Sequence, residues 1–256
     1  MGMEAAIKEE LKKLEDSENV KVIIAVESGS RAWGFPSPDS DYDVRFIYVR
    51  NQADYLRLDA VGDVIEWKLD EVLDISGWDI RKALRLLYKS NPTLFEWCSS
   101  PIIYKETEEA QWLKELLPCY FSVKKSLNHY WNMAHTTYQK YIKGDEVRLK
   151  KYFYVLRPIL AAQWVLEKRS APPMLFDTLV DAELEESLRP VVDQLLDMKK
   201  AAPEMGTAAK IDAINEYVDR KLDEIQSAAE SIDNTEAEWG PLNELFLRIL
   251  DPQKSV

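Results

Sequence analysis

The chain has 256 residues, of which 46% are apolar and 30% are charged. This composition is typical of a globular protein with a sizeable buried core, and it argues against a disordered chain. The formal net charge of −12 argues against a general nucleic-acid-binding protein.

The first 20 residues read as a charged amphipathic helix rather than as a signal peptide. No apolar run in the sequence approaches the roughly 20 residues that a membrane-spanning helix needs. We therefore expect a cytoplasmic protein with no membrane partner.

Residues 20–50 read as two strands joined by a loop. Residues 20–29 form a run rich in Val and Ile that stops at Gly29, which is typical of a buried strand. Residues 41–49 alternate in polarity, so that Asp41, Asp43 and Arg45 are expected on one face. The opposite face would carry Tyr42, Val44, Phe46 and Tyr48.

Further strand-like stretches at residues 63–67 and 72–79 precede a helix that begins at Ile80. From about residue 106 onward the apolar periodicity is helical, with helices expected at 108–117, 122–144, 146–170, 182–199, 207–231 and 235–250. The predicted fold class is α+β. A domain with a small mixed sheet and flanking helices is expected at residues 1–110, followed by an all-helical domain at 111–256.

The carboxylates at the start of the second strand suggest a metal site. Side chains two residues apart on a strand lie roughly 7 Å apart at their roots, which lets Asp41 and Asp43 share metal ions. Gly29 and Ser30, at the end of the preceding strand, offer backbone amides and a hydroxyl to a phosphate. Mg²⁺ is commonly held by one or two carboxylates together with substrate phosphates, so this pattern predicts a site for Mg²⁺ or Mn²⁺.

A third carboxylate is expected from a neighbouring strand, and the candidates are Glu66, Asp74 and Asp79. We favour Asp79 as a catalytic metal ligand, because it lies between apolar residues where a strand passes into a helix. The same position is also that of a good helix N-cap. Asp74 is the alternative.

Several basic residues are candidates for binding a nucleotide. Arg31 could contact phosphates or pair with the acidic residues beside it. Lys150, Tyr154 and Arg157 recur at helical spacing and could present a ring and two cations, although Tyr154 could equally pack between helices. They lie within residues 121–170, which hold ten Lys or Arg against three Asp or Glu and could form either a phosphate-binding surface or a solvated helix face.

The Gly29-Ser30 pair and the Asp41-Tyr42-Asp43 triplet resemble the signature of the DNA polymerase β-type nucleotidyltransferases. The blocks GSRAWGFPSPDSDYDVRFIYV, DISGWDIRKAL, KSNPTLFEW and GDEVRLKKYFYVLRPIL, in this order, are similar to the YcgL-type predicted nucleotidyltransferases, also called RlaP and linked by name to RNA repair. The resemblance covers about residues 20–175 and does not extend to the C-terminal helices.

This resemblance implies that Gly29 and Ser30 hold a nucleoside triphosphate while Asp41, Asp43 and Asp79 ligate Mg²⁺. It implies transfer of a nucleoside monophosphate to a hydroxyl acceptor. RNA is the leading candidate for the acceptor, because residues 121–170 are basic and the family is linked by name to RNA repair. The alternatives are transfer to a protein or a small molecule, or a nucleotide-binding regulator without catalysis. Neither the preferred base nor the oligomeric state can be read from the sequence.

Overall fold

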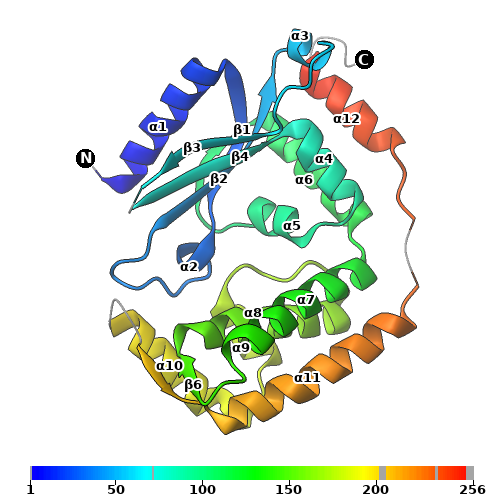
Figure 1. The fold of residues 1–256 in the computed structure, drawn as a ribbon. Coiled ribbons are helices and arrows are strands. Elements are labelled where there is room, and N and C mark those ends of the chain that lie inside the picture. Colours follow the sequence, from blue (N-terminus) through cyan, green and yellow to red (C-terminus); the bar gives the residue numbers. More distant parts are fainter. Residues whose placement is uncertain (1, 71, 202–205, 234–235, 252–256) are drawn as a thin grey trace. The chain divides into compact units, whose positions relative to one another are not determined.

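The computed structural model describes residues 2–70, 72–201, 206–233 and 236–251 (Figure 1). The chain forms two compact units. The first, here called the sheet unit, comprises Met1–Ala32, Asp41–Tyr120 and Glu236–Val256. The second, the helical unit, comprises Trp33–Ser40 and Phe121–Thr235. Both units are therefore built from segments that are not continuous in sequence.

The sheet unit contains a mixed sheet with the strand order β3-β4-β2-β1-β5. Its strands are β1 (Val20–Glu27), β2 (Tyr42–Arg50), β3 (Val64–Leu69), β4 (Leu73–Asp79) and β5 (Ile103–Glu106). Strands β2 and β4 run parallel, whereas the other neighbouring pairs are antiparallel. The predicted α+β class with a small mixed sheet is confirmed.

Helices cover both faces of this sheet (Figure 1). The helices of the sheet unit are α1 (Met3–Glu18), α2 (Gly29–Ala32), α3 (Gln52–Tyr55), α4 (Ile80–Tyr88), α5 (Pro92–Cys98), α6 (Glu108–Tyr120) and α12 (Gly240–Leu250), of which α12 packs on α4 and α6. Helix α1 packs its buried apolar residues against the face that carries Val44, Phe46 and Tyr48. Helices α4, α5 and α6 contact β1, β2 and β4 from the other face. The alternation expected for residues 42–48 is therefore present in β2.

The helical unit is built around α8 (Lys150–Lys168), which contacts α7 (Val123–Tyr141), α9 (Phe176–Glu183) and α11 (Asp212–Ser231). A short 3₁₀ helix, Glu186–Leu188, leads into α10 (Arg189–Ala201). Two strands that the sequence did not predict, β6 (Glu146–Arg148) and β7 (Thr207–Ala209), form an antiparallel pair. The residues of these strands stand at the start of segments that read as helix, and three residues are too few to show a strand periodicity.

The segment 33–40 belongs to the core of the helical unit. Phe35 is 1% exposed, and the centroid of its ring lies 4.9 Å from that of Phe153 and 5.2 Å from that of Phe176. The backbone N–H of Phe176 donates to the carbonyl oxygen of Trp33 at 2.9 Å. The loop that joins the first two strands of the sheet is thus anchored by apolar packing among helices.

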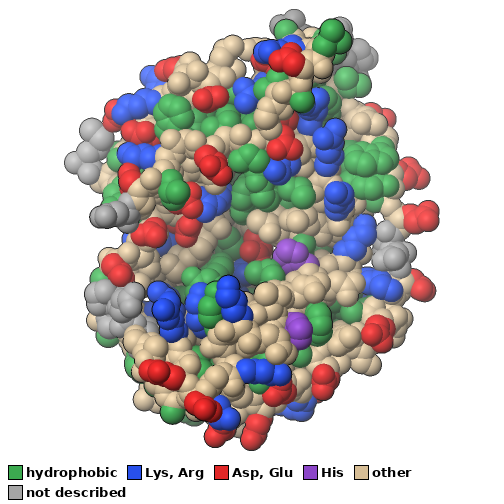
Figure 2. Space-filling view, viewed as in Figure 1, with side chains coloured by type: hydrophobic (Ala, Val, Ile, Leu, Met, Phe, Trp, Pro, Cys, Tyr) green, Lys and Arg blue, Asp and Glu red, His purple; other side chains and the backbone are tan. Residues whose placement is uncertain are grey.

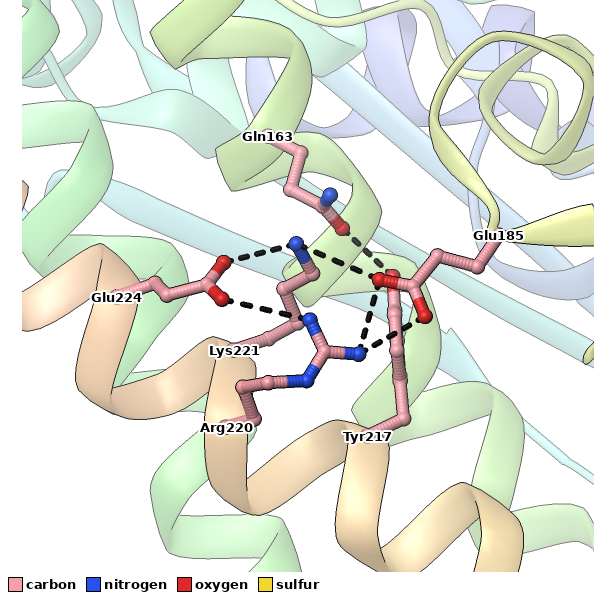
Figure 3. Close-up of polar contacts among 6 residues, drawn as sticks. All are labelled: Gln163, Glu185, Tyr217, Arg220, Lys221 and Glu224. Carbon is pink, nitrogen blue, oxygen red and sulfur yellow. Dashed lines mark hydrogen bonds and ion pairs between the residues drawn. The ribbon is translucent and has the colours of Figure 1, made fainter.

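Helix α11 is joined to its neighbours by a polar network (Figure 3). The hydroxyl of the buried Tyr217 donates to Gln163 of α8 at 2.6 Å. Arg220 donates twice to the carboxylate of Glu185, at 2.8 and 2.9 Å, and Lys221 pairs with the same carboxylate. The Arg220–Glu185 ion pair is exposed and contributes little to stability, so the buried Tyr217 contact is a stronger constraint on α11.

Among the described residues, no helix combines the length and the apolar character required to cross a bilayer.

Candidate functional site

The register of the sheet places two carboxylates side by side. Strands β2 and β4 pair in parallel with Asp43 opposite Asp74, and both side chains are about one-third exposed. Asp41 lies just before β2 and is exposed. Its charge and that of Asp74 both act on Asp43, so the three carboxylates share one electrostatic environment.

Gly29 lies against the Asp43 carboxylate. Its φ of +60° falls in the left-handed region, and a Cβ atom built on it would lie 2.0 Å from Oδ2 of Asp43. Any other residue would combine an unfavourable backbone conformation with a direct clash. The sequence indicated that Gly29 allows a close approach, and the structure identifies Asp43 as a group that makes one.

Arg45 links the two paired carboxylates. Its Nη2 atom donates to Oδ1 of Asp43 at 3.2 Å and to Oδ2 of Asp74 at 2.6 Å. Its Nη1 atom also donates to the carbonyl oxygens of Val44 and Asp74. Arg45 therefore fixes one oxygen of Asp43, while the other faces Gly29.

The buried Glu27 holds the backbone of Asp43 from the end of β1. Glu27 is 0% exposed, and its Oε1 atom accepts from the backbone N–H of Asp43 at 2.8 Å. Its Oε2 atom accepts from the hydroxyl of Tyr104. The backbone N–H of Ser28 donates to the carbonyl oxygen of Asp43 at 2.8 Å. Both polar groups of the Asp43 backbone are thus held by the segment that leads into Gly29.

Burial sets the electrostatics of this cluster. It raises the pKa of Asp43 above its ordinary value, and the charges of Asp74 and Asp41 act in the same direction, whereas Arg45 opposes them. Burial also raises the pKa of Glu27, against the lowering effect of its hydrogen bonds from Tyr104 and from the Asp43 amide. A cation placed near Asp43 would relieve the mutual repulsion of the carboxylates.

Arg31 lies at the end of α2, beside this cluster. Its Nε atom donates to the carbonyl oxygen of Asp41 at 3.0 Å, and its guanidinium lies 3.7 Å from the ring centroid of Tyr42. Its charge lowers the pKa values of Asp43 and Glu27. Ser30 belongs to the same short helix. The fold thus brings Gly29, Ser30, Arg31, Asp41 and Asp43 together at the start of β2.

The structure separates Asp79 from these residues. Asp79 pairs in register with Tyr48, five positions along β4 from Asp74, which corresponds to about 17 Å. Its Oδ1 atom accepts from the backbone N–H of Arg81, as the N-cap of α4, and its Oδ2 atom accepts from the hydroxyl of Tyr55. The N-cap interpretation therefore describes Asp79, and Asp74 is the carboxylate that β4 places beside Asp43.

Lys150, Tyr154 and Arg157 all lie on α8, in the helical unit, but they do not share one exposed face. Arg157 is 1% exposed, with its guanidinium 4.7 Å from the ring centroid of Trp33. Tyr154 is 45% exposed and meets Trp33 edge-on. Burial within the helical core removes Arg157 from the expected nucleotide-binding set.

The described side chains do not form a ready metal cage. No group of three or more His, Cys, Asp or Glu side chains in residues 2–70, 72–201, 206–233 and 236–251 converges closely enough to hold an ion. The acidic side chains near Asp43, those of Asp41 and Asp74, nonetheless offer carboxylate oxygens, which are ligands that Mg²⁺ prefers. An ion shared with phosphate oxygens would need fewer protein ligands than such a cage supplies.

Glu27 and Tyr104 were not among the predicted site residues. A signal for Glu27 was present, since a carboxylate ends a run that is otherwise apolar. Tyr104 carried no comparable signal, because its partner lies 77 residues away in sequence.

A family model and a curated relative agree with the resemblance noted in the sequence. The model of a family described as "RlaP: RNA repair pathway DNA polymerase beta family" matches residues 3–248. The "Uncharacterized protein YcgL" of Bacillus subtilis (strain 168) is 44% identical over 252 residues, which cover 97% of each chain. A crystal structure of a nucleotidyltransferase-like protein from Exiguobacterium sibiricum 255-15 aligns with 99% of this chain and 81% of its own, at 13% identity and a TM-score of 0.33. The chain therefore belongs to the RNA repair pathway DNA polymerase beta family.

Proposed function

We propose that this protein is a nucleotidyltransferase dependent on Mg²⁺ or Mn²⁺ that transfers a nucleoside monophosphate from a nucleoside triphosphate to a hydroxyl group of RNA. Membership of the polymerase β-type family supports the general activity. The metal, the triphosphate and the RNA acceptor are the proposed refinements.

One observation carries the proposal. Asp43 is held by Glu27 and Ser28 through its backbone and by Arg45 through Oδ1, while Oδ2 faces Gly29. A carboxylate fixed so firmly, with one oxygen directed toward a short glycine-led turn, is organised to hold a cation beside a phosphate group.

Asp41 and Asp43 are the proposed metal ligands, with Asp74 as the third carboxylate in place of Asp79. Arg45 balances the charge between Asp43 and Asp74, so that the paired carboxylates tolerate their partial burial. When bound, Mg²⁺ would neutralise phosphate charge and increase the acidity of the attacking hydroxyl.

Gly29, Ser30 and Arg31 are the proposed contacts for the triphosphate. The acceptor hydroxyl oxygen forms a bond to the α-phosphorus, and the bond from that phosphorus to the oxygen bridging to the β-phosphate breaks. Pyrophosphate leaves with the bonding electron pair, and the hydroxyl proton passes to water. The protein contributes mainly by positioning and charge stabilisation, as in phosphoryl transfer generally.

The proposal can be tested with α-labelled nucleoside triphosphates. The protein would be incubated with each of the four triphosphates, Mg²⁺ or Mn²⁺ and a total RNA pool, and RNA and protein would be resolved on the same gel. We expect label in RNA for the wild type and loss of that label for the double variant Asp41→Asn/Asp43→Asn. Asp63→Asn, which removes an exposed carboxylate paired with Lys82, is the matched control and should retain activity.

The other outcomes separate the alternatives. Label on a protein band would keep the transfer chemistry and exclude RNA as the acceptor. Measurable triphosphate binding without label on any acceptor would exclude the transferase and favour a nucleotide-binding regulator.

A further inference from the structure

The helical unit carries exposed tyrosine rings around a lysine. Tyr141, at the end of α7, is 37% exposed, and Tyr154 of α8 is 45% exposed. The Nζ atom of Lys151 lies 4.5 Å from the ring centroid of Tyr141 and 4.9 Å from that of Tyr154. The two ring centroids are therefore at most 9.4 Å apart, the sum of these distances, and one ammonium lies near both rings.

Further cations surround Tyr141. The Nζ atom of Lys140 lies 5.0 Å from the centroid of the Tyr141 ring. Hydrogen bonding by Lys140, together with the charges of Lys140, Lys151 and Arg148, lowers the pKa of Tyr141. Three cations, Lys140, Lys151 and Arg148, therefore contribute positive charge around the Tyr141 ring.

These cations have no acidic partners among the residues that the structure describes. An ion pair within residues 121–170 joins Lys168 to Glu167, at the far end of α8, about 26 Å along the helix axis from Lys151. Lys140, Arg148 and Lys151 pair with no carboxylate in the described part of the chain. Figure 2 shows Lys and Arg side chains beside apolar ones on the helical unit.

The rest of the chain is strongly acidic. Residues 121–170 carry ten Lys or Arg and three Asp or Glu, a net charge of +7, whereas the whole chain carries −12. A concentrated positive field in an acidic protein attracts a polyanion to one place rather than to the whole surface.

We propose that Tyr141, Lys151 and Tyr154, with Lys140 beside them, form a docking surface for single-stranded RNA. Two exposed rings can stack on two unpaired bases, and the ammonium near both rings can contact the intervening phosphate. Single strands suit this surface because their bases are free to stack, whereas duplex bases are already stacked. RNA, rather than another polyanion, is chosen on the basis of the proposed function.

The test is fluorescence anisotropy of a labelled 12-nucleotide oligouridylate with the full chain, at salt concentrations from 50 to 200 mM. Lys151→Ala is expected to weaken binding about 5-fold or more and to reduce the slope of log affinity against log salt by about 0.7, the value for one phosphate contact on a single strand. Tyr141→Leu/Tyr154→Leu should weaken binding about 25-fold or more, because each stacked base contributes at least about 5-fold, and should leave the salt slope unchanged.

Lys168→Ala is the matched control, since it removes the same charge from the same helix at a site paired with Glu167. Its affinity should stay within about 2-fold of wild type. All the substituted side chains are exposed or only partly buried, and equal thermal unfolding midpoints would verify that each variant folds.

The proposal is overturned if the wild type does not bind the oligouridylate, if the tyrosine variant binds as the wild type does, or if DNA of the corresponding sequence binds more tightly. A salt-dependent change in sedimentation caused by Lys151→Ala without any change in RNA affinity would instead identify an acidic second copy as the occupant. RNA binding at this surface without nucleotide transfer would overturn the proposed function alone. Transfer to RNA with unaltered affinity in the variants would overturn the docking surface alone.

Discussion

Gly29 has two roles: it adopts a left-handed backbone conformation, and it leaves room for the Asp43 carboxylate. Substitution by Ala, compared with the same change at another glycine, separates these roles. Gly29→Ala places a Cβ atom against Asp43 at a φ of +60°, so we expect a loss of about 1–2 kcal/mol in the free energy of unfolding from the backbone. Displacement of Asp43 should also lower the transfer rate about 100-fold. Chemical denaturation and the labelled-nucleotide assay measure the two effects.

Gly206→Ala is the matched control for this experiment. Gly206 also has a positive φ, +65°, but no atom of the residues that the structure describes, its chain neighbours aside, lies within 4 Å of the position of its Cβ atom. The Gly206→Ala variant should lose a similar free energy of unfolding and retain full transfer activity. Equal activity losses in the two variants would show that Gly29 acts through backbone strain rather than through the Asp43 contact.

Asp74 and Asp79 are expected to respond in opposite ways to substitution. Asp74→Asn removes a charge from the pair bridged by Arg45 and should reduce transfer about 10- to 100-fold, with little change in stability. Asp79→Ala removes an N-cap and should lower the free energy of unfolding by about 1–2 kcal/mol. Its transfer rate per folded molecule should match the wild type, and unchanged stability with lost activity would restore Asp79 as a ligand.

At the scale of the element, the pairing of β2 with β4 decides which carboxylate joins Asp43. Alternation along one strand is a local property, so the faces of residues 42–48 could be predicted. The parallel register between β2 and β4 depends on the path of the chain through β3, at the edge of the sheet beyond β4, and on the packing of the whole sheet. No pattern within residues 63–79 fixes that offset, and the choice of Asp79 over Asp74 followed from this missing information.

Helix α5 buries Cys98, which gives a pH-dependent prediction. Burial raises the pKa of Cys98 to about 12, whereas Cys119 is exposed. At pH 8 a thiol reagent should therefore label Cys119 in the folded protein and label Cys98 only after denaturation. Rapid labelling of both thiols without denaturant would contradict the packing of α5.

The same shift predicts a loss of stability at alkaline pH. The unfolded chain releases the Cys98 proton near pH 9, before the folded chain does, so that this contribution to stability is fully present below pH 9. It is lost progressively as the pH rises from about 9 to about 12. The free energy of unfolding would be measured for the wild type and for Cys98→Ala at pH 8 and at pH 10.5. Between these two pH values it should decrease less in the variant than in the wild type.

At the scale of the whole molecule, Phe35 stabilises the helical unit, whereas β1 and β2, the strands on either side of it in sequence, belong to the sheet unit. Phe35→Ala removes a ring packed against Phe153 and Phe176. We expect the free energy of unfolding to fall by about 3–5 kcal/mol. Hydrogen exchange should show reduced protection in α8 and α9 while β1 and β2 remain protected.

Phe46→Ala provides the reverse comparison. Phe46 is also 1% exposed, but it lies in the core of the sheet unit. Its loss should reduce protection in the sheet strands first. If each substitution reduced protection equally in both units, the two cores would not be energetically separate.

The chain's helices could largely be predicted, because apolar periodicity is local and α7, α8 and α11 each span about 20 residues. It could not be predicted that segment 33–40 belongs to the helical unit and segment 236–251 to the sheet unit. Nothing within residues 33–40 distinguishes an exposed loop from one whose Phe35 enters another core, since that difference depends on residues more than 100 positions away.

The interleaving of the two units also constrains how such a protein can be altered over evolutionary time. Recombination that exchanged residues 121–235 for an unrelated helical segment would leave Phe35 and Trp33 without the partners they have here. Residues 121–235 moved into another protein would in turn lack residues 33–40, which contribute Phe35 to their core. The two units are therefore expected to be inherited together, as a single heritable module, rather than reshuffled among proteins.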